Sequence, residues 1–178
     1  MQIAGGVYHV TARGNRRQAI YSDTRSRERF LFVLDDVVTR MRWRVHAYCL
    51  MTNHYHLLVE TLDPNIGRGM ERLNGIYARW FNWRHGYAGH LFERRYHDEL
   101  VERDAHLFEL ARYIVLNPVR AKLCAHPAEW KWSSYNAAVA NIEPPSFLTL
   151  DWLLAQFGST PAAARKHYAD FIAAIDAH

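Results

Sequence analysis

The sequence predicts an α+β fold in which helices pack against an antiparallel β-sheet. Three observations lead to this class: β-rich runs alternate with runs at helical spacing, the composition is globular, and long apolar runs are missing. Hydrophobic residues make up 49% and charged residues 22% of the 178 residues. The longest apolar runs hold only a few residues, against the ~18 of a membrane-spanning helix. We therefore expect one domain with a small appendage and no membrane partner. The N-terminus does not resemble a signal peptide, so we expect a cytoplasmic protein.

Four segments are predicted to form the strands of the sheet. They are rich in β-branched and aromatic residues, and turn-forming residues bound them. The segments are residues 7–12, 44–51, 54–60 and 96–101. A basic, turn-like loop, Arg13-Gly14-Asn15-Arg16-Arg17, follows the first strand.

Two helices are predicted between these strands. Residues 24–42 place apolar side chains at helical spacing behind an N-cap at Asp23 or Thr24. A longer helical segment starts at Asp63-Pro64-Asn65 and extends to about Arg84. Because glycine weakens a helix, we expect the internal glycines to interrupt or loosen this segment. They are Gly67, Gly69 and Gly75.

A third helix is predicted from Asp104 to about Asn117, and Pro118 is expected to end it. The resulting order is strand, helix, strand, strand, helix, strand, helix. Because this order contains two βαβ-like halves, we predict a ferredoxin-like antiparallel sheet with packed helices.

The last part of the chain is predicted to be a small helical C-terminal extension. Pro144-Pro145 marks a boundary, so we divide the chain into a core at residues 1–143 and an extension at residues 144–178. Two helices are expected within residues 147–178, with Pro161 at the first position of the second. The extension carries little charge and no obvious chemistry.

The basic residues gather in the first two thirds of the chain. Residues 1–124 hold 19 of the 22 Lys and Arg but 13 of the 18 Asp and Glu, and 19 of the 22 basic residues are arginine. Arginine presents a planar donor fork that suits phosphate oxygens, and it stacks on bases. Aromatic residues make up 13%, and many adjoin an arginine. This pairing favours a nucleic-acid partner. A GC-rich genome that favours Arg codons is the alternative explanation.

His54 and His56 lie two residues apart in one predicted strand. Their side chains therefore project from the same face, where both can reach one divalent metal ion. Histidines at this spacing are more often accidental or satisfied by hydrogen bonds, so the pair alone does not define a metal site. Cys49 and Cys124 are too few for a cysteine metal cage, and we expect each to be a small buried hydrophobe.

The third predicted helix carries a polar face. Tyr113 and Asn117 are four residues apart and share this face with His106 and Glu109. The amide oxygen of Asn117 could complete a metal site begun by the two histidines. The competing interpretation is an ordinary amphipathic helix with a half-buried tyrosine.

Several separated stretches resemble the single-tyrosine HUH transposases, most closely the REP-associated tyrosine transposases of bacteria. The HUH motif is histidine, a hydrophobic residue and histidine; here it is His54-Tyr55-His56 within LMTNHYHLLVE. The other matching stretches are VYHVTARGNRRQAIY, ARWFNWRHGYAGHLFERRY, RYIVLNPVRAKL and EWKWSSYNA. Because they occur in the family's order over roughly residues 7–140, the resemblance is specific. Residues 147–178 lie outside it.

The resemblance implies a fold, a catalyst and a substrate. The fold is a ferredoxin-like domain with the histidine pair on a central strand. Tyr113 corresponds to the nucleophile, and His54, His56 and Asn117 correspond to the ligands of Mg²⁺ or Mn²⁺. The implied reaction is cleavage and rejoining of single-stranded or hairpin DNA, of the repetitive extragenic palindrome type, through a 5′-phosphotyrosine. The active unit is a monomer or a homodimer. Tyr55 replaces an aliphatic residue, but it should point away from the metal site.

Two basic segments are expected to bind the DNA: the loop after the first strand and the region around the glycine-bearing loop. The residues are Arg13, Asn15, Arg16, Arg17, Arg84, Arg94 and Arg95. Phosphate contacts of this kind give a steep salt dependence but little sequence information. Arg25, Arg27 and Arg29 are expected to be solvated surface.

Three other functions stay open at this point. A metal-dependent nuclease would use water in place of Tyr113. A hairpin-binding protein without turnover would not need the complete set of site residues. A small-molecule enzyme with a metal site would not explain the excess of arginine. Tyr77 is a competing nucleophile, but its place beside Trp80 and Phe81 favours packing.

Overall fold

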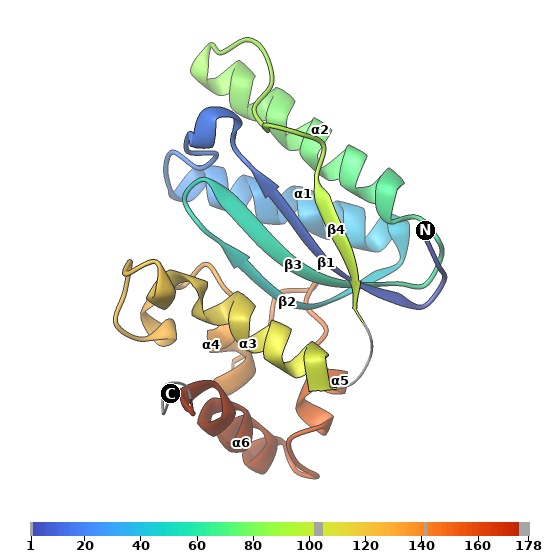
Figure 1. The fold of residues 1–178 in the computed structure, drawn as a ribbon, viewed down its shortest axis with the longest axis vertical. Coiled ribbons are helices and arrows are strands. Elements are labelled where there is room, and N and C mark those ends of the chain that lie inside the picture. The colour runs from blue at the N-terminus through green and yellow to red at the C-terminus, as the bar shows by residue number, and fades with distance from the viewer. Residues whose placement is uncertain (1, 102–104, 141, 175–178) are drawn as a thin grey trace.

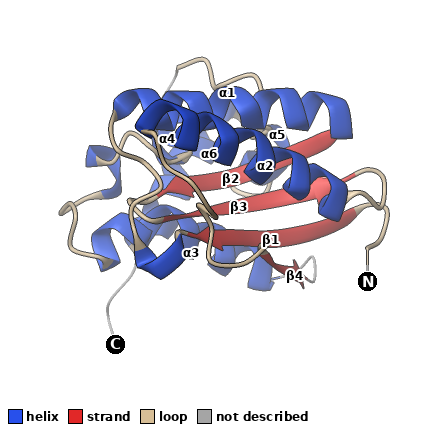
Figure 2. Cartoon of the chain, turned by 90° about the horizontal axis from the view of Figure 1, so that it is seen from above, coloured by secondary structure: helices blue, strands red, loops and turns tan. Residues whose placement is uncertain are grey.

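The computed structural model describes residues 2–101, 105–140 and 142–174. This part of the chain contains the strands β1 (Gly6–Arg13), β2 (Trp43–Leu50), β3 (His54–Thr61) and β4 (His97–Val101). They form an antiparallel sheet in the order β2-β3-β1-β4 (Figure 2). This order confirms the predicted ferredoxin-like sheet.

Helices lie on both faces of the sheet (Figure 1). On one face, α1 (Thr24–Met41) and α2 (Ile66–His85) pack together, and the α1 side chain Phe30 meets Tyr55 of β3 at 4.7 Å between ring centroids. On the other face, α3 (Ala105–Arg120) packs mainly against β2. The described chain also contains these shorter elements: η1 (Asn15–Arg17), η2 (Pro127–Glu129), α4 (Tyr135–Val139), α5 (Asp151–Ala155) and α6 (Pro161–Ala173).

The start of α1 is fixed by a capping box. The carboxylate of Asp23 accepts a hydrogen bond from the backbone N–H of Ser26 at 2.8 Å, and the Ser26 hydroxyl accepts one from the backbone N–H of Asp23 at 3.0 Å. Of the two predicted caps, Asp23 is therefore the one used. Arg84 of α2 donates to both carboxylate oxygens of Asp23, at 2.9 and 2.6 Å, and so joins the two helices.

Arg27 is not the solvated surface residue that was expected. Its guanidinium carbon lies 5.1 Å from the centroid of the Tyr21 ring and 5.7 Å from those of Trp130 and Trp132. Its Nη2 donates to the carbonyl of Met51 at 3.1 Å. Trp130 and Trp132 come from a segment distant in sequence, so the spacing of Arg27 on α1 gave no sign of them. Arg25 is exposed, as expected, and Arg29 is half-buried.

The prediction that glycines interrupt the second helix is wrong. α2 runs without a break from Ile66 to His85. At Gly69 a Cβ atom would lie 2.0 Å from the buried ring of Trp43, so glycine permits close packing of α2 on β2. Gly75 faces open space apart from the flexible Arg79. At Gly69, helix–sheet packing therefore outweighs the low helix propensity of glycine.

The predicted end of the third helix is also wrong, because α3 continues through Pro118 to Arg120. Proline has no N–H for the carbonyl four residues earlier, which is that of Ile114. One position before it, the Tyr113 carbonyl accepts a hydrogen bond from the side-chain amide of Asn117 at 3.2 Å. Pro118 is buried, which favours keeping it in the packed helix. The helix closes at Lys122, where φ is +58°. The predicted first residue, Asp104, lies outside the described residues.

The C-terminal helices share the core of the sheet. Thr160 caps α6 and Pro161 is its first residue, as predicted. Phe147, Tyr168 and Ile172 belong to one hydrophobic cluster with the strands. The division at residues 143 and 144 stays a prediction. Within the described ranges, no helix is long and apolar enough to span a membrane.

Candidate active site

Strand alternation places His54 and His56 on the face of β3 that is turned away from α1 and α2. Tyr55, between them, points to the opposite face, as predicted. It is completely buried, and its hydroxyl donates to Oδ1 of Asn74 in α2 at 2.5 Å. Tyr55 therefore packs between the sheet and the helices α1 and α2. His54 and His56 lie on the opposite face of β3 and do not compete with it for space.

His56 is held by a second histidine. Its Nδ1 lies 3.0 Å from Nε2 of His9 in the neighbouring strand β1, and the two rings stack with centroids 5.2 Å apart. A proton on His56 Nδ1 leaves its Nε2 with a lone pair. Among the described residues, this buried Nε2 atom has no hydrogen-bond partner. An unpaired buried nitrogen of this kind fits a metal ligand.

His54 is oriented in the same way by Asn53. Its Nδ1 lies 2.7 Å from Asn53 Oδ1. The Nδ2 group of Asn53 donates to the carbonyl of Arg17 at 3.0 Å, which turns Oδ1 toward the histidine. The proton therefore sits on His54 Nδ1, and Nε2 keeps its lone pair. The His54 and His56 ring centroids are 5.1 Å apart.

Burial keeps these histidines neutral. It lowers the pKa of His56 to about 3, with smaller contributions from His54 and His9. It also lowers the pKa of His9 to about 4, although Glu99 acts in the opposite direction. The pKa of His54 is lowered by burial and by Arg13. Neutral imidazole is the form that binds a metal ion.

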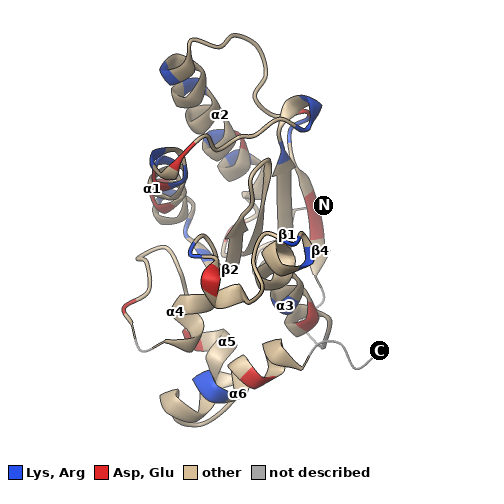
Figure 3. Ribbon diagram, turned by 90° about the vertical axis from the view of Figure 1, so that its left-hand side faces the viewer, with Lys and Arg blue, Asp and Glu red and all other residues tan. Residues whose placement is uncertain are grey.

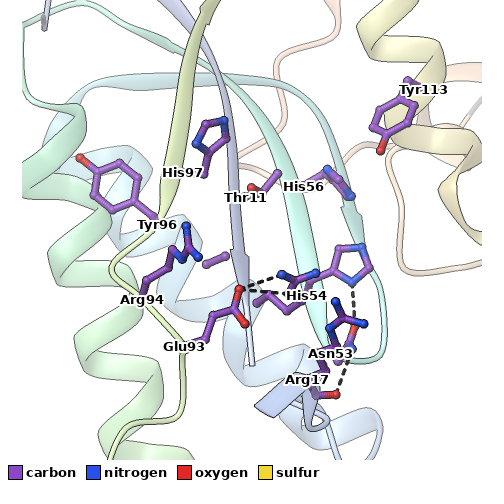
Figure 4. Close-up of a pocket in the computed structure, with 12 residues that line it drawn as sticks. Thr11, Arg17, Asn53, His54, His56, Glu93, Arg94, Tyr96, His97 and Tyr113 are labelled. Atoms are coloured by element: carbon purple, nitrogen blue, oxygen red, sulfur yellow. Dashed lines mark hydrogen bonds and ion pairs between the residues drawn. The ribbon is translucent and has the colours of Figure 1, made fainter. Parts of the chain in front are cut away.

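Tyr113 faces the histidines from α3. Its ring centroid lies 5.6 Å from that of His56 and 6.3 Å from that of His9, with the rings edge to face. Tyr113 is 37% exposed, so it can reach a bound molecule. It lines a cavity of about 600 Å³ together with His54 and His56 (Figure 4).

Asn117 is the one proposed ligand that does not line this cavity. It lies one turn after Tyr113, half-buried, and its amide nitrogen is engaged with the Tyr113 carbonyl. In the part of the chain that the structure describes, no three His, Cys, Asp or Glu residues gather as a metal site. A metal ion on the two histidines therefore needs another kind of ligand, such as an amide.

The predicted DNA-binding residues divide into three groups. Arg17 and Arg94 line the cavity (Figure 4), as does Arg13, which pairs with Glu93 at 2.9 Å. Asn15 and Arg16 line a neighbouring hollow of about 800 Å³, and Arg95 lines another of about 530 Å³. Arg84 instead holds Asp23. The basic residues gather around α1, α2 and the adjoining loops, with few on α4, α5 and α6 (Figure 3).

Besides Asn53, the sequence analysis missed His9 as a site residue. It stands in the first strand, two residues before Thr11, which pairs with His56. The available signal was the predicted ferredoxin-like order, because that order puts the first and third strands side by side. The alternation of β1 then places His9 on the histidine face.

The fold and the facing histidines and tyrosine point to a DNA-processing enzyme of the transposase class. The family model described as "Transposase IS200 like" matches residues 3–117, which is more than half of the chain. The chain therefore belongs to the IS200-like transposase family and is a DNA-binding transposase. The resemblance stated from the sequence motifs is thereby confirmed.

The solved structures that resemble the chain include two transposases. The structure of a REP-associated tyrosine transposase bound to a REP hairpin is 18% identical, with a TM-score of 0.68 over 85% of this chain and 89% of that chain. At this identity the likeness shows a shared fold. A putative transposase from Deinococcus radiodurans R1 is 20% identical, with a TM-score of 0.45 over 64% of this chain and 89% of that chain. No curated protein matches the chain.

Proposed function

We propose that the protein is a metal-dependent transesterase of single-stranded DNA. It binds hairpin DNA and cleaves and rejoins it through a 5′-phosphotyrosine intermediate on Tyr113. The observation that carries this proposal is the meeting of Tyr113 with His54 and His56 at one cavity. The solved relative that is bound to a REP hairpin supports a hairpin of that type as substrate.

His54 and His56 would hold Mg²⁺ or Mn²⁺ through their Nε2 atoms, and Asn117 would add its amide oxygen. Two features support the histidines as metal ligands. The buried Nε2 of His56 has no hydrogen-bond partner among the described residues, and the contact with Asn53 leaves Nε2 of His54 free. Mn²⁺ suits mixed imidazole and amide ligation, and Mg²⁺ prefers oxygen. When bound, the cation would polarise the phosphate oxygens and stabilise the leaving 3′ oxygen.

The protein's own residues have separate tasks in this reaction. The hydroxyl of Tyr113 attacks the phosphorus, so that a Tyr113 Oη–P bond forms while the bond from phosphorus to the 3′ oxygen breaks. Arg13, Arg17 and Arg94 bind phosphates along the cavity. Because the phosphotyrosine keeps the phosphodiester energy, a later 3′-hydroxyl can displace the tyrosine and rejoin DNA without ATP.

Covalent trapping tests the nucleophile. Wild-type protein is incubated with a single-stranded hairpin and Mg²⁺ or Mn²⁺, and adducts are separated on a denaturing gel. We expect a protein–DNA adduct that Tyr113→Phe abolishes while hairpin binding is retained. Tyr77→Phe is the matched control, because Tyr77 is buried and its hydroxyl donates to the Ile20 carbonyl.

The other functions give different results in the same experiment. Cleavage without attached protein would indicate a nuclease that uses water. Hairpin binding with intact DNA would indicate a binding protein without turnover. An adduct that persists in Tyr113→Phe would show that another residue is the nucleophile.

A further inference from the structure

Arg120 lies on the same face of α3 as Tyr113. The two residues are seven positions apart, which at ~100° per residue brings them to within roughly 20° of the same direction. This alignment exists because the helix continues through Pro118 instead of ending there. The guanidinium carbon of Arg120 lies 5.2 Å from the centroid of the Tyr113 ring, a cation–π contact.

The charge of Arg120 is not neutralised by any acidic side chain of the described residues. Arg112 is the other arginine of this helix. It pairs with Glu109 and lies over the ring of Phe171. Arg120 is exposed at the end of α3, where its guanidinium contacts Tyr113 alone among the described rings. It therefore places an uncompensated cation beside the proposed nucleophile.

We propose that Arg120 is a further catalytic residue, which binds the non-bridging oxygens of the scissile phosphate beside Tyr113. This assignment rests on the proposed function. The planar guanidinium presents two parallel N–H donors to a phosphate. The cation–π contact with the Tyr113 ring holds it beside the nucleophile before DNA arrives. A cation already aimed at developing charge is an effective way to stabilise a transition state.

The chemical step consumes no reagent besides the DNA, and solvent only exchanges protons with the reacting oxygens. Tyr113 Oη bonds to phosphorus as the bond to the 3′ oxygen breaks. The phenolic proton passes to solvent, and the released 3′ oxygen takes up a proton. Arg120 keeps its own proton and forms no covalent bond. Its contribution is greatest when five oxygens surround the phosphorus and the negative charge on the non-bridging oxygens is at its largest.

Single-turnover adduct formation tests this role. We compare wild type with Arg120→Gln, Arg120→Lys and the matched control Lys122→Gln, which removes a charge near the end of the same helix. We expect Arg120→Gln to slow adduct formation about a hundredfold. Hairpin affinity should fall far less than the rate of adduct formation, since only one phosphate contact of many is lost. Arg120→Lys should recover part of the rate, and Lys122→Gln should react like wild type.

A neutral substrate separates phosphate binding from a merely structural role. In a hairpin with a methylphosphonate at the scissile position, one charged oxygen is replaced by a methyl group. If Arg120 acts on that charge, wild type and Arg120→Gln should react with similar rates on this substrate. An equal loss on both substrates would show that Arg120 only orients the tyrosine ring.

Two further results would overturn the assignment. One is adduct formation by Arg120→Gln at the wild-type rate. The other is a loss of rate in Lys122→Gln as large as that in Arg120→Gln. Absence of an adduct in wild type would instead contradict the proposed function, and the assignment with it.

Discussion

His9 determines which nitrogen of His56 remains for a ligand. By occupying Nδ1 of His56 at 3.0 Å, it leaves Nε2 as the free nitrogen. Asn53 does the same for His54 at 2.7 Å. Partners of this kind fix the ring orientation of a metal-binding histidine and its proton position. At the residue scale, the candidate site is therefore a set of two histidines and the two neighbours that orient them.

Removing the acceptor at position 9 should weaken metal binding. We expect His9→Ala to lower Mn²⁺ affinity by about 10- to 100-fold. His9→Gln should recover part of this loss, because its amide oxygen can accept a hydrogen bond from Nδ1. Calorimetry on DNA-free protein measures both affinities. His97→Ala is the control, since His97 lines the same cavity on the exposed strand β4. Unchanged Mn²⁺ affinity in His9→Ala would contradict this role.

The sequence predicted the histidine pair but not its partners. His54 and His56 share a face in any strand, so their spacing alone brings them together. The contact of His9 with His56 depends on the register between β1 and β3, which places Thr11 opposite His56. Register between strands that are distant in sequence follows from the packed sheet and cannot be read from spacing within one strand.

At the scale of elements, two helices run through residues that were expected to break them. In α2, Gly69 allows the helix to approach the ring of Trp43. In α3, Pro118 is buried and the helix continues one turn further. Both errors have one cause: propensity describes an isolated helix, and packing on a sheet changes the balance. The second error hid the alignment of Arg120 with Tyr113.

Two glycine substitutions in α2 should have opposite effects on stability. We expect Gly69→Ala to destabilise the protein by about 1–3 kcal/mol, because the added methyl group overlaps the Trp43 ring. Gly75→Ala should stabilise it by about 0.5–1 kcal/mol, because alanine favours the helix and only the flexible Arg79 lies near. Urea unfolding of both variants measures the difference. Equal stabilities would show that the Trp43 contact does not limit residue 69.

At the scale of the whole molecule, the order of strands and helices was predictable. Which arginines are paired with acidic residues and which can bind DNA was not. The order of elements along the chain was predictable because each strand or helix follows from the residue pattern of its own short segment. Which arginines are free depends on acids that are distant in sequence. Arg84 is neutralised by Asp23, 61 positions earlier, and Arg13 pairs with Glu93, 80 positions later. Composition alone therefore identified a basic protein but not its contact surface.

The salt dependence of hairpin binding should distinguish arginines that face the cavity from those held elsewhere. Arg94 lines the cavity, so Arg94→Gln should weaken binding and reduce the slope of log K against log[salt] by about one unit. Arg84→Gln should leave the slope unchanged, because its guanidinium is already bound to Asp23 at the cap of α1. Fluorescence anisotropy at several salt concentrations measures both slopes.

A thermal unfolding control completes this comparison. Arg84→Gln removes an ion pair that joins α1 to α2, so it should lower the melting temperature while Arg94→Gln should not. Equal slopes for wild type and Arg94→Gln would remove Arg94 from the interface. A reduced slope for Arg84→Gln would show that DNA displaces Asp23, and the binding surface would then extend from the cavity to the end of α2.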